Sequence, residues 1–547
     1  MSLQFITGNS GNGKTKYLFN RIVKEAKANP RDNYLVIVPE QFTMQTQRQL
    51  VDLSENKAIM NIDVLSFKRL AYRVFDELGI TNLTVLEETG KNLVLRKLAA
   101  QEADKLGVIG RNLNRIGYIS EVKSLLSELV QYNISPEELG RYIASGSLSD
   151  TLSDKLKDVL VLYEAFEKFM QDKYITAEEI LNVLSNVAEE SAILRNSVIA
   201  FDEFTGFTPI QNQLIKKLFV ISKKIYVTLT IDCREDIFKS RGMQELFDMP
   251  KRTVKSLTEM AAFYGIEVEE PIILDKNYRL AENEELSFME QQLFRKRRCS
   301  FKKAPKHIHI DCLRDPKQEL TKIARRINEL VRNENLRYRD IAIVTGDVNI
   351  YAGYVREIFD KYNIPYFIDA TQEILFHPFI EFIRSIPDIA AQNFSADAVF
   401  RFLRCGFSEL LDSEIDVLEN YVLACGVRGK SAWDKKWVRL PKHKAGYDLE
   451  LLNQSREYIM ELLKPVYQVF SDKKSTVKDY VLAIYKLIVL LDIPDKLAKK
   501  EQALLDAGDQ TASKEYGQIY KIVMQLFEKY VAVLGDECMD AEEFTQI

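Results

Sequence analysis

The sequence has few residues of the kinds that hold metals. It contains six cysteines and four histidines in 547 residues. No C-x-x-C pair occurs among them, so no zinc or iron–sulfur framework can be read from their spacing. Scattered cysteines also indicate a reducing compartment, and we expect a cytoplasmic protein. At about 150 residues per domain, the length predicts three or four domains.

Long apolar runs and an excess of positive charge are also missing. No run approaches the ~18 apolar residues of a membrane span. The first residues do not resemble a secretion signal, so we expect a soluble protein with no membrane partner. Lys plus Arg number 75 and Asp plus Glu 80, which gives a net charge of −5. Proteins that coat nucleic acid are usually basic, so a DNA or RNA partner would need a local basic groove here.

Short apolar runs alternate with helical patterns in the first 85 residues, which is typical of a parallel sheet crossed by helices. From 86 to 191 the apolar residues follow only the helical period, and short apolar runs then resume. The expected strands are residues 3–7, 33–38, 62–65, 198–201, 225–231 and 272–274. We therefore predict an α/β domain of residues 1–85 and 192–300, interrupted by a helical insertion at 86–191.

A basic stretch, residues 295–306, follows this domain. Its interpretation is either a solvated hinge or a segment that tracks a phosphate backbone. Beyond it the alternation of strands and helices is repeated, and residues 301–393 are predicted to begin a second α/β lobe. The elements expected there are strands at 307–313, 340–344 and 364–368 and a helix at 320–331. Residues 394–547 again follow the helical period.

The first expected strand leads into eight residues that fit G-x-x-x-x-G-K-[ST] and precede a helical pattern. Successive backbone amides and the positive end of a helix dipole form an anion cradle there, which glycines allow phosphate to approach. We predict that Lys14 reaches the β- and γ-phosphates of ATP and that the Thr15 hydroxyl ligates Mg²⁺. The alternative is a glycine-rich turn without a ligand. The predicted nucleotide-binding residues are Gly8, Asn9, Ser10, Gly11, Asn12, Gly13, Lys14 and Thr15.

Two acidic residues, Asp202 and Glu203, follow the expected strand at 198–201. Beside a phosphate loop, Asp202 is predicted to hold Mg²⁺, usually through water, and Glu203 to polarise the attacking water. The alternative is a strand that ends in solvated acids.

Arg279 follows the expected strand at 272–274 and is predicted to contact the γ-phosphate and sense its loss. The alternative is a surface ion pair with Glu282, Glu284 or Glu285.

Three aromatic residues have a nucleic-acid interpretation beside a structural one. Phe42, after the second expected strand, is either a platform for a base of single-stranded DNA or a core side chain. Trp433 and Trp437 either form a basic-aromatic patch or pack inside helices. The cations beside them are Lys435, Lys436 and Arg439.

Taken in order, these segments resemble the AddB family, the B subunits of bacterial AddAB helicase-nucleases, in their Firmicutes form. The segments that carry the resemblance, which spans essentially the whole chain, are GNSGNGKT, YLVIVPEQFT, VIAFDEFTGFTPIQ, DKNYR, YRDIAIVTGD and YNIPYFID. In the wider superfamily 1 helicases this order corresponds to two motor lobes, each with an insertion. The resemblance therefore implies an α/β fold with two RecA-like P-loop lobes, and residues 394–547 as the second insertion.

The resemblance also implies partners and activities. It implies a heterodimer with an AddA subunit that processes double-stranded DNA ends for recombinational repair. It further implies binding of single-stranded DNA and a part in recognising the recombination hotspot Chi. AddB-like chains are roughly twice as long and end in a RecB-type nuclease domain with an Fe–S cluster held by four cysteines. Since neither feature occurs here, we expect an N-terminal fragment that does not cut DNA.

Departures from an active superfamily 1 motor bear on how ATP is used. Seven residues before Gly8 leave no room for the glutamine motif that reads adenine, and Thr205 stands where Gln commonly follows the acidic pair. Asp232-Cys233-Arg234 stands where an active motor has G-D-x-x-Q. We predict a motor-like scaffold that binds ATP·Mg²⁺ without driving unwinding. The alternatives are an autonomous superfamily 1 translocase that hydrolyses ATP and a P-loop phosphotransferase for a small molecule.

Overall fold

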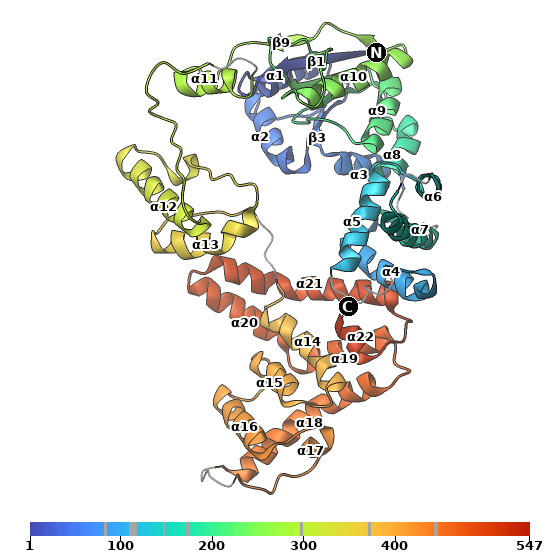
Figure 1. The fold of residues 1–547 in the computed structure, drawn as a ribbon, viewed down its shortest axis with the longest axis vertical. Coiled ribbons are helices and arrows are strands. Elements are labelled where there is room, and N and C mark those ends of the chain that lie inside the picture. The colour runs from blue at the N-terminus through green and yellow to red at the C-terminus, as the bar shows by residue number, and fades with distance from the viewer. Residues whose placement is uncertain are drawn as a thin grey trace. The chain divides into compact units, whose positions relative to one another are not determined.

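The structure is a computed structural model that describes residues 1–80, 85–108, 117–145, 148–170, 174–295, 299–369, 374–441 and 447–546. The chain divides into two compact units (Figure 1). Unit 1 comprises Met1–Ala281 and Phe382–Ile547, and unit 2 comprises Glu282–Glu381. No helix among the described residues is both long enough and apolar enough to span a membrane.

Unit 1 begins with a seven-stranded parallel sheet in the order β3-β2-β6-β7-β1-β8, in which β9 also pairs with β1. All six strands expected from the sequence are present, and only the two-residue β8 was not expected. The strands are β1 (Ser2–Gly8), β2 (Tyr34–Ile37), β3 (Ile62–Leu65), β6 (Val198–Phe201), β7 (Lys224–Thr230), β8 (Glu267–Val268) and β9 (Ile272–Leu274). Near-continuous apolar sequences such as that of β6 predict this arrangement, because a parallel sheet is covered on both faces.

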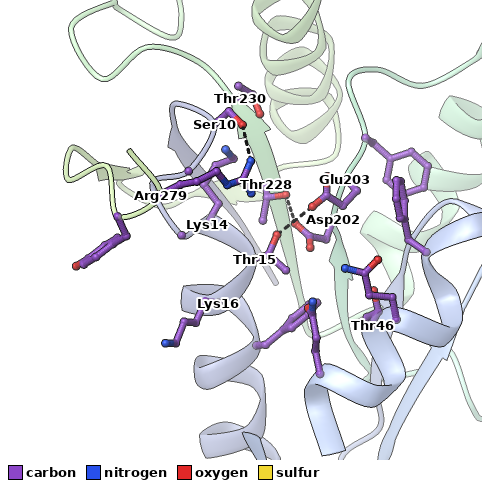
Figure 2. Close-up of a pocket in the computed structure, with 18 of the residues that line it drawn as sticks. Ser10, Lys14, Thr15, Lys16, Thr46, Asp202, Glu203, Thr228, Thr230 and Arg279 are labelled. Carbon is purple, nitrogen blue, oxygen red and sulfur yellow. Dashed lines mark hydrogen bonds between the residues drawn. The ribbon is translucent and has the colours of Figure 1, made fainter. Parts of the chain in front are cut away.

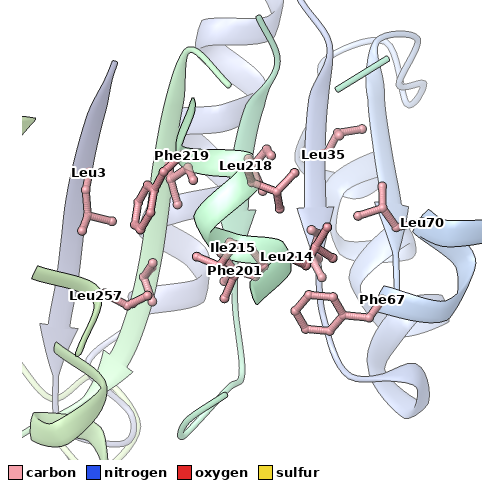
Figure 3. Packing of buried hydrophobic residues seen from close by; sticks show 14 of the residues in the cluster. Leu3, Leu35, Phe67, Leu70, Phe201, Leu214, Ile215, Leu218, Phe219 and Leu257 are labelled. Atoms are coloured by element: carbon pink, nitrogen blue, oxygen red, sulfur yellow. The ribbon is translucent and has the colours of Figure 1, made fainter. Parts of the chain in front are cut away.

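Helices cover both faces of the sheet. One face packs against α1 (Lys14–Ala28) and α2 (Thr43–Leu53), through a cluster that includes Leu18, Val36 and Leu50. The other face packs against α3 (Phe67–Leu78), α8 (Ile180–Val187), α9 (Pro209–Ile221) and α10 (Asp248–Phe263). Figure 3 shows Leu214 and Leu218 of α9 over this second face, and both are fully buried. Burying each such side chain contributes about 1.5–3 kcal/mol to stability.

The segment between β3 and β6 is mostly helical. A two-stranded sheet that the sequence did not indicate joins its ends. Its elements are β4 (Val85–Leu86), α4 (Glu88–Gln101), α5 (Tyr118–Gln131), α6 (Pro136–Ala144), α7 (Asp150–Met170) and β5 (Ile175–Thr176). Lys91 on α4 is 2% exposed, and its Nζ donates to Glu178 Oε2 at 2.6 Å and to Ser127 Oγ at 3.3 Å. This buried ammonium therefore ties α4 to α5 and to the segment after β5.

The C-terminal part of unit 1 is also helical. Its helices are α14 (Pro378–Ala391), which belongs to unit 1 from Phe382 on, α15 (Ala396–Arg404), α16 (Asp412–Cys425), α17 (Lys430–Asp434), α18 (Leu449–Ser471), α19 (Val477–Leu490), α20 (Ile493–Asp506), α21 (Gln510–Leu534) and α22 (Ala541–Gln546). Helix α21 packs against α4. Lys97 Nζ lies 2.8 Å from Glu537 Oε1, and Lys529 pairs with Glu87. The C-terminal helices and the first insertion therefore share an interface.

Unit 2 contains α11 (Glu284–Gln292), α12 (Pro316–Asn333) and α13 (Val348–Lys361). The helix expected at 320–331 lies within α12. The strands expected at 307–313, 340–344 and 364–368 are wrong, since these described segments are not assigned as strands. A strand requires a partner for its backbone hydrogen bonds, and Ile310, Val344 and Phe367 in these segments are 93%, 93% and 88% exposed. A second RecA-like lobe therefore stays a prediction.

Candidate nucleotide site

The loop between β1 and α1 has the conformation that its glycines predict. Gly11 and Gly13 adopt φ of 90° and 79°, in the left-handed region that L side chains disfavour. A Cβ atom on Gly11 would lie 2.7 Å from Asn277 Oδ1 and 2.8 Å from Arg279 Cβ. The loop therefore needs glycine at this position both for its backbone conformation and for its approach to residues 277–279.

Two asparagines of the motif lie behind the loop. Asn9 and Asn12 are 7% and 2% exposed, and Asn12 Nδ2 donates to the carbonyl oxygen of Leu274 at 2.6 Å. Leu274 ends β9, which pairs with β1 at Gly8. Asn12 thus fixes the loop against the neighbouring strand.

The Lys14 ammonium lies within the loop. Its Nζ donates to the carbonyl oxygens of Gly8 and Asn9, both at 3.1 Å. Burial lowers the pKa of Lys14 below its ordinary value, and the carboxylates of Glu203 and Asp202 oppose this effect. An anion bound to the loop would favour the charged form of Lys14.

The two acidic candidates lie beside the loop although they follow β6 (Figure 2). The Thr15 hydroxyl donates to Glu203 Oε1 at 3.3 Å. Asp202 is 1% exposed, and its Oδ1 accepts a hydrogen bond from the Thr228 hydroxyl. Burial raises the pKa of the Asp202 carboxyl above its ordinary value, while the Thr228 hydrogen bond opposes the rise. The site therefore holds one buried and one exposed carboxylate.

Asp202 and Thr15 suit a hard divalent cation. Asp202 Oδ2 is buried and has no hydrogen-bond partner among the described residues. Carboxylate and hydroxyl oxygens are ligands that Mg²⁺ accepts, and it completes its shell with water and phosphate oxygens. Among the described residues, no cluster of three or more His, Cys, Asp or Glu side chains could hold a metal without such added ligands.

Arg279 lies against the phosphate loop. Its Nη1 is 3.5 Å from Ser10 Oγ, and its backbone amide donates to the Gly11 carbonyl oxygen at 3.4 Å. Of the three acids considered as alternative partners, Glu284 pairs with Lys303, and Glu285 accepts from the backbone amides of Lys306 and His307. The contact of Arg279 with a γ-phosphate stays a prediction.

A pocket of ≈ 770 Å³ opens in front of the loop (Figure 2). It is lined by every candidate site residue except Gly8, Asn9 and Asn12. The pocket continues from Glu203 along α2, where Phe42, Thr46 and Gln49 form its wall. Phe42 also packs against the sheet cluster, so its ring belongs to both the pocket and the core.

Three residues of the site carry no prediction from the sequence. Thr228 lies in the middle of an apolar strand, and its polar character in VTLT is the only signal. Asn277 Nδ2 donates to the Ser10 carbonyl oxygen at 3.0 Å, and the Tyr278 ring would lie 3.6 Å from a Cβ on Gly13. Tyr278 is 65% exposed, with Lys276 Nζ 4.9 Å from its ring centre. The parallel pairing of β9 with β1 brings this segment to the loop.

The structure tests the nucleic-acid interpretation of the two tryptophans but not that of the basic stretch. Trp433 and Trp437 are 0% and 7% exposed, and Trp437 Nε1 donates to the Ala432 carbonyl oxygen at 3.0 Å. Buried indoles cannot stack on bases, so the nucleic-acid interpretation of these tryptophans is wrong and the packing interpretation holds. In the basic stretch 295–306, Lys296, Arg297 and Arg298 lie outside the described residues, and both interpretations of that stretch stay predictions.

A family model described as "ADDB, N-terminal" matches residues 5–290. The match covers the phosphate loop, the acidic pair and Arg279.

Curated relatives match along the whole chain. The B subunit of the ATP-dependent helicase/deoxyribonuclease of Lachnoclostridium phytofermentans is 38% identical over 557 residues, and that of Clostridium acetobutylicum is 32% identical over 559 residues. The corresponding protein of Clostridioides difficile is 31% identical over 561 residues. Each match covers 100% of this chain and 48% of the relative. The chain therefore spans about half the length of the curated relatives it matches.

Proposed function

The chain belongs to the AddB family, and on that premise we propose that it binds ATP·Mg²⁺ as part of a subunit that processes DNA ends. The observation that carries the proposal is the convergence of Lys14, Thr15 and Asp202 on one pocket from separate parts of the chain. In this proposal the complete subunit is a hydrolase of the helicase/deoxyribonuclease type.

Each residue of the site has a role in this proposal. The backbone amides of residues 8–15 and the N-terminus of α1 hold the phosphates, and Lys14 turns its ammonium to the β- and γ-phosphates. Thr15 and Asp202 ligate Mg²⁺ directly or through water. Glu203 orients the attacking water, and Arg279 contacts the γ-phosphate. The exposed ring of Tyr278 beside Gly13 is suited to stack on the base of the nucleotide.

We further propose that this part of the subunit is a motor-like scaffold. In an active motor the segment after β7 couples the nucleotide to DNA. Here Arg234 Nη2 lies 2.6 Å from Asp232 Oδ2, so both side chains engage one another. The support for the scaffold is that Asp232-Cys233-Arg234 stands where an active motor has G-D-x-x-Q. The alternative is an autonomous superfamily 1 translocase.

The partners of the whole protein are proposals that rest on family membership. They are an AddA-type subunit in a heterodimer, single-stranded DNA held along two lobes, double-stranded DNA ends, and Chi as the recognised sequence. The lobes are proposed as residues 1–85 with 192–300 and, for the second, 301–393, with insertions at 86–191 and 394–547. The nuclease and its Fe–S cluster are proposed for the half of the relatives that this chain does not span.

Nucleotide binding and turnover by the chain test the proposal. We expect the wild-type chain to bind a fluorescent ATP analogue in the presence of Mg²⁺, with slow turnover that single-stranded DNA does not stimulate. Lys14→Ala weakens binding at least about tenfold, because a charge-assisted hydrogen bond to phosphate is lost. Lys24→Ala, which removes an exposed charge from the same helix, leaves binding unchanged.

Three outcomes contradict this proposal in different ways. Failure of the wild-type chain to bind nucleotide would remove the proposed site. Strong DNA-stimulated turnover that Lys14→Ala abolishes would replace the scaffold by the translocase. Binding of a labelled single strand at rising salt tests the DNA partner, since phosphate contacts weaken with salt. Absence of DNA affinity would favour a small-molecule phosphotransferase.

A further inference from the structure

The two oxygens of the Asp202 carboxylate have different surroundings. Oδ1 accepts the hydrogen bond from the Thr228 hydroxyl. Oδ2 is equally buried and has no hydrogen-bond partner among the described residues. A buried carboxylate oxygen without a donor is unfavourable by itself, because its desolvation is not compensated. One oxygen is therefore fixed by the protein, and the other is left for a ligand.

The sheet register explains why Thr228 is the residue that reaches Asp202. Strands β6 and β7 are parallel, with Phe201 opposite Val227, so Asp202 and Thr228 occupy the next position on each strand. Side chains alternate between faces along a strand. Ala200 and Tyr226 belong to the cluster on the α1 side of the sheet. Asp202 and Thr228, two residues further on, point to that same side, where Thr15 lies (Figure 2).

We propose that Thr228 is a positioning residue for Mg²⁺ in the nucleotide site. Its hydroxyl holds Oδ1 of Asp202 and thereby keeps Oδ2 turned to the Thr15 side. This inference rests on the proposed function and adds to it a residue that no nucleotide-binding motif of the sequence contains. Thr228 acts through Asp202 and touches neither phosphate nor metal in this role, so its loss affects the metal rather than the phosphates.

Titration with Mg²⁺ separates this role from a structural one. The full chain is titrated with Mg²⁺ while binding of a fluorescent ATP analogue is followed, with EDTA as the zero point. Thr228→Val is expected to raise the Mg²⁺ concentration at half-maximal effect about tenfold, because a hydrogen bond to a charged group is lost. Binding in EDTA stays within about twofold of wild type, because the loop amides and Lys14 still hold the phosphates. Thr228→Ser, which keeps the hydroxyl, restores the wild-type titration.

Thr7 provides the matched control. It is buried in β1, opposite Leu229 of β7, and its hydroxyl has no hydrogen-bond partner among the described residues. Thr7→Val makes the same chemical change in the same sheet without touching Asp202, and it should titrate as wild type. Where Thr228→Val does not fold, Thr228→Ala and Thr7→Ala make the same comparison.

The outcomes distinguish this inference from the function it rests on. A wild-type chain that binds no nucleotide overturns both. A wild-type chain with Mg²⁺-dependent binding overturns the inference alone if Thr228→Val titrates unchanged. The inference is also overturned if Thr7→Val raises the required Mg²⁺ concentration as much as Thr228→Val does. It is overturned as well if Thr228→Val weakens nucleotide binding equally with Mg²⁺ and in EDTA, because either result means general damage to the sheet.

Discussion

The Thr15 hydroxyl donates a hydrogen bond of 3.3 Å to the Glu203 carboxylate and so joins the start of α1 to the turn after β6, 188 residues along the chain. Glu203 has a φ of 64°, a conformation that glycine adopts freely and other residues do not. Strained backbone of this kind is maintained where the surrounding structure fixes it, and it is frequent at functional sites. The conformation of Glu203 turns its carboxylate to the phosphate loop.

The backbone of Glu203 can be tested apart from its carboxylate. Glu203→Ala and Glu203→Gly both lose the hydrogen bond to Thr15, but only alanine must keep an L side chain in the left-handed region. We expect the free energy of local opening to be about 1–2 kcal/mol higher in the glycine variant than in the alanine variant. Hydrogen exchange of the peptide that contains β6 measures this difference. Equal protection in the two variants would show that residue 203 does not keep this conformation in solution.

Gly11→Ala tests the contact between the phosphate loop and residues 277–279. The added Cβ would lie 2.7 Å from Asn277 Oδ1, which is too close. Alanine would also be strained by the positive φ at this position. Gly79, at the end of α3, has a φ of 69° with nothing within 4 Å of a Cβ, so Gly79→Ala carries the conformational cost alone. We expect Gly11→Ala to cost about 1–3 kcal/mol more, the usual range for overpacking.

Thermal unfolding and hydrogen exchange of the two alanine variants make the comparison. Gly11→Ala should also weaken ATP binding, while Gly79→Ala should not. Similar losses of stability with unchanged binding would mean that the loop and residues 277–279 separate without cost.

The strands and the phosphate loop of the first sheet can be predicted from the sequence for a local reason. The strands before Gly8 and Asp202 are apolar runs that end at motifs of fixed spacing, and both signals lie within a few residues. Thr228 carries no such signal, because its role depends on the register of β7 against β6. The position of Tyr278 depends in the same way on the pairing of β9 with β1.

The wrong predictions concern features that depend on distant parts of the chain. Residues 307–313 have the composition of a strand, but a strand also requires a neighbour in space, which composition does not supply. Trp433 and Trp437 stand among lysines, and local composition does not reveal that Trp433 packs against Phe394 and that the backbone of this segment contacts α18. There Asn453 Nδ2 donates to the Trp437 carbonyl oxygen at 2.9 Å, and Arg456 Nη1 donates to that of Trp433 at 2.8 Å.

Arg279→Ala tests the proposed contact with the γ-phosphate. The guanidinium Nη1 lies 3.5 Å from Ser10 Oγ of the loop. We expect the variant to lose about tenfold in affinity for ATP and little in affinity for ADP, because a charge-assisted hydrogen bond to the terminal phosphate is worth about 1.5–3 kcal/mol. Lys239→Ala, which removes an exposed cation outside the pocket, controls for the change in net charge. Equal losses for both nucleotides would place Arg279 at the inner phosphates or the loop alone.

The ion pair between Glu87 and Lys529 tests the interface of α4 with α21. Hydrogen bonding to Lys529, followed by its charge, lowers the pKa of Glu87 below the ordinary value of 4.5. A carboxylate whose pKa is lower in the folded than in the unfolded protein stabilises the fold at a pH above the unfolded-state pKa. This contribution is lost as the pH falls through the folded-state pKa. Because the side chains of Glu87 and Lys529 are 68% and 35% exposed, we expect at most about 1 kcal/mol of coupling at pH 7.

A double-mutant cycle of Glu87→Gln and Lys529→Met, followed by thermal unfolding at pH 7 and pH 3, measures this coupling. We expect the coupling to be present at pH 7 and smaller at pH 3, because it is lost as the pH falls through the lowered pKa of Glu87. The two residues lie 442 positions apart, so coupling between them requires the first insertion to contact the C-terminal helices in solution. A zero coupling at pH 7, together with a zero coupling for Lys97 with Glu537, would mean that the two helical parts move independently and do not form one unit.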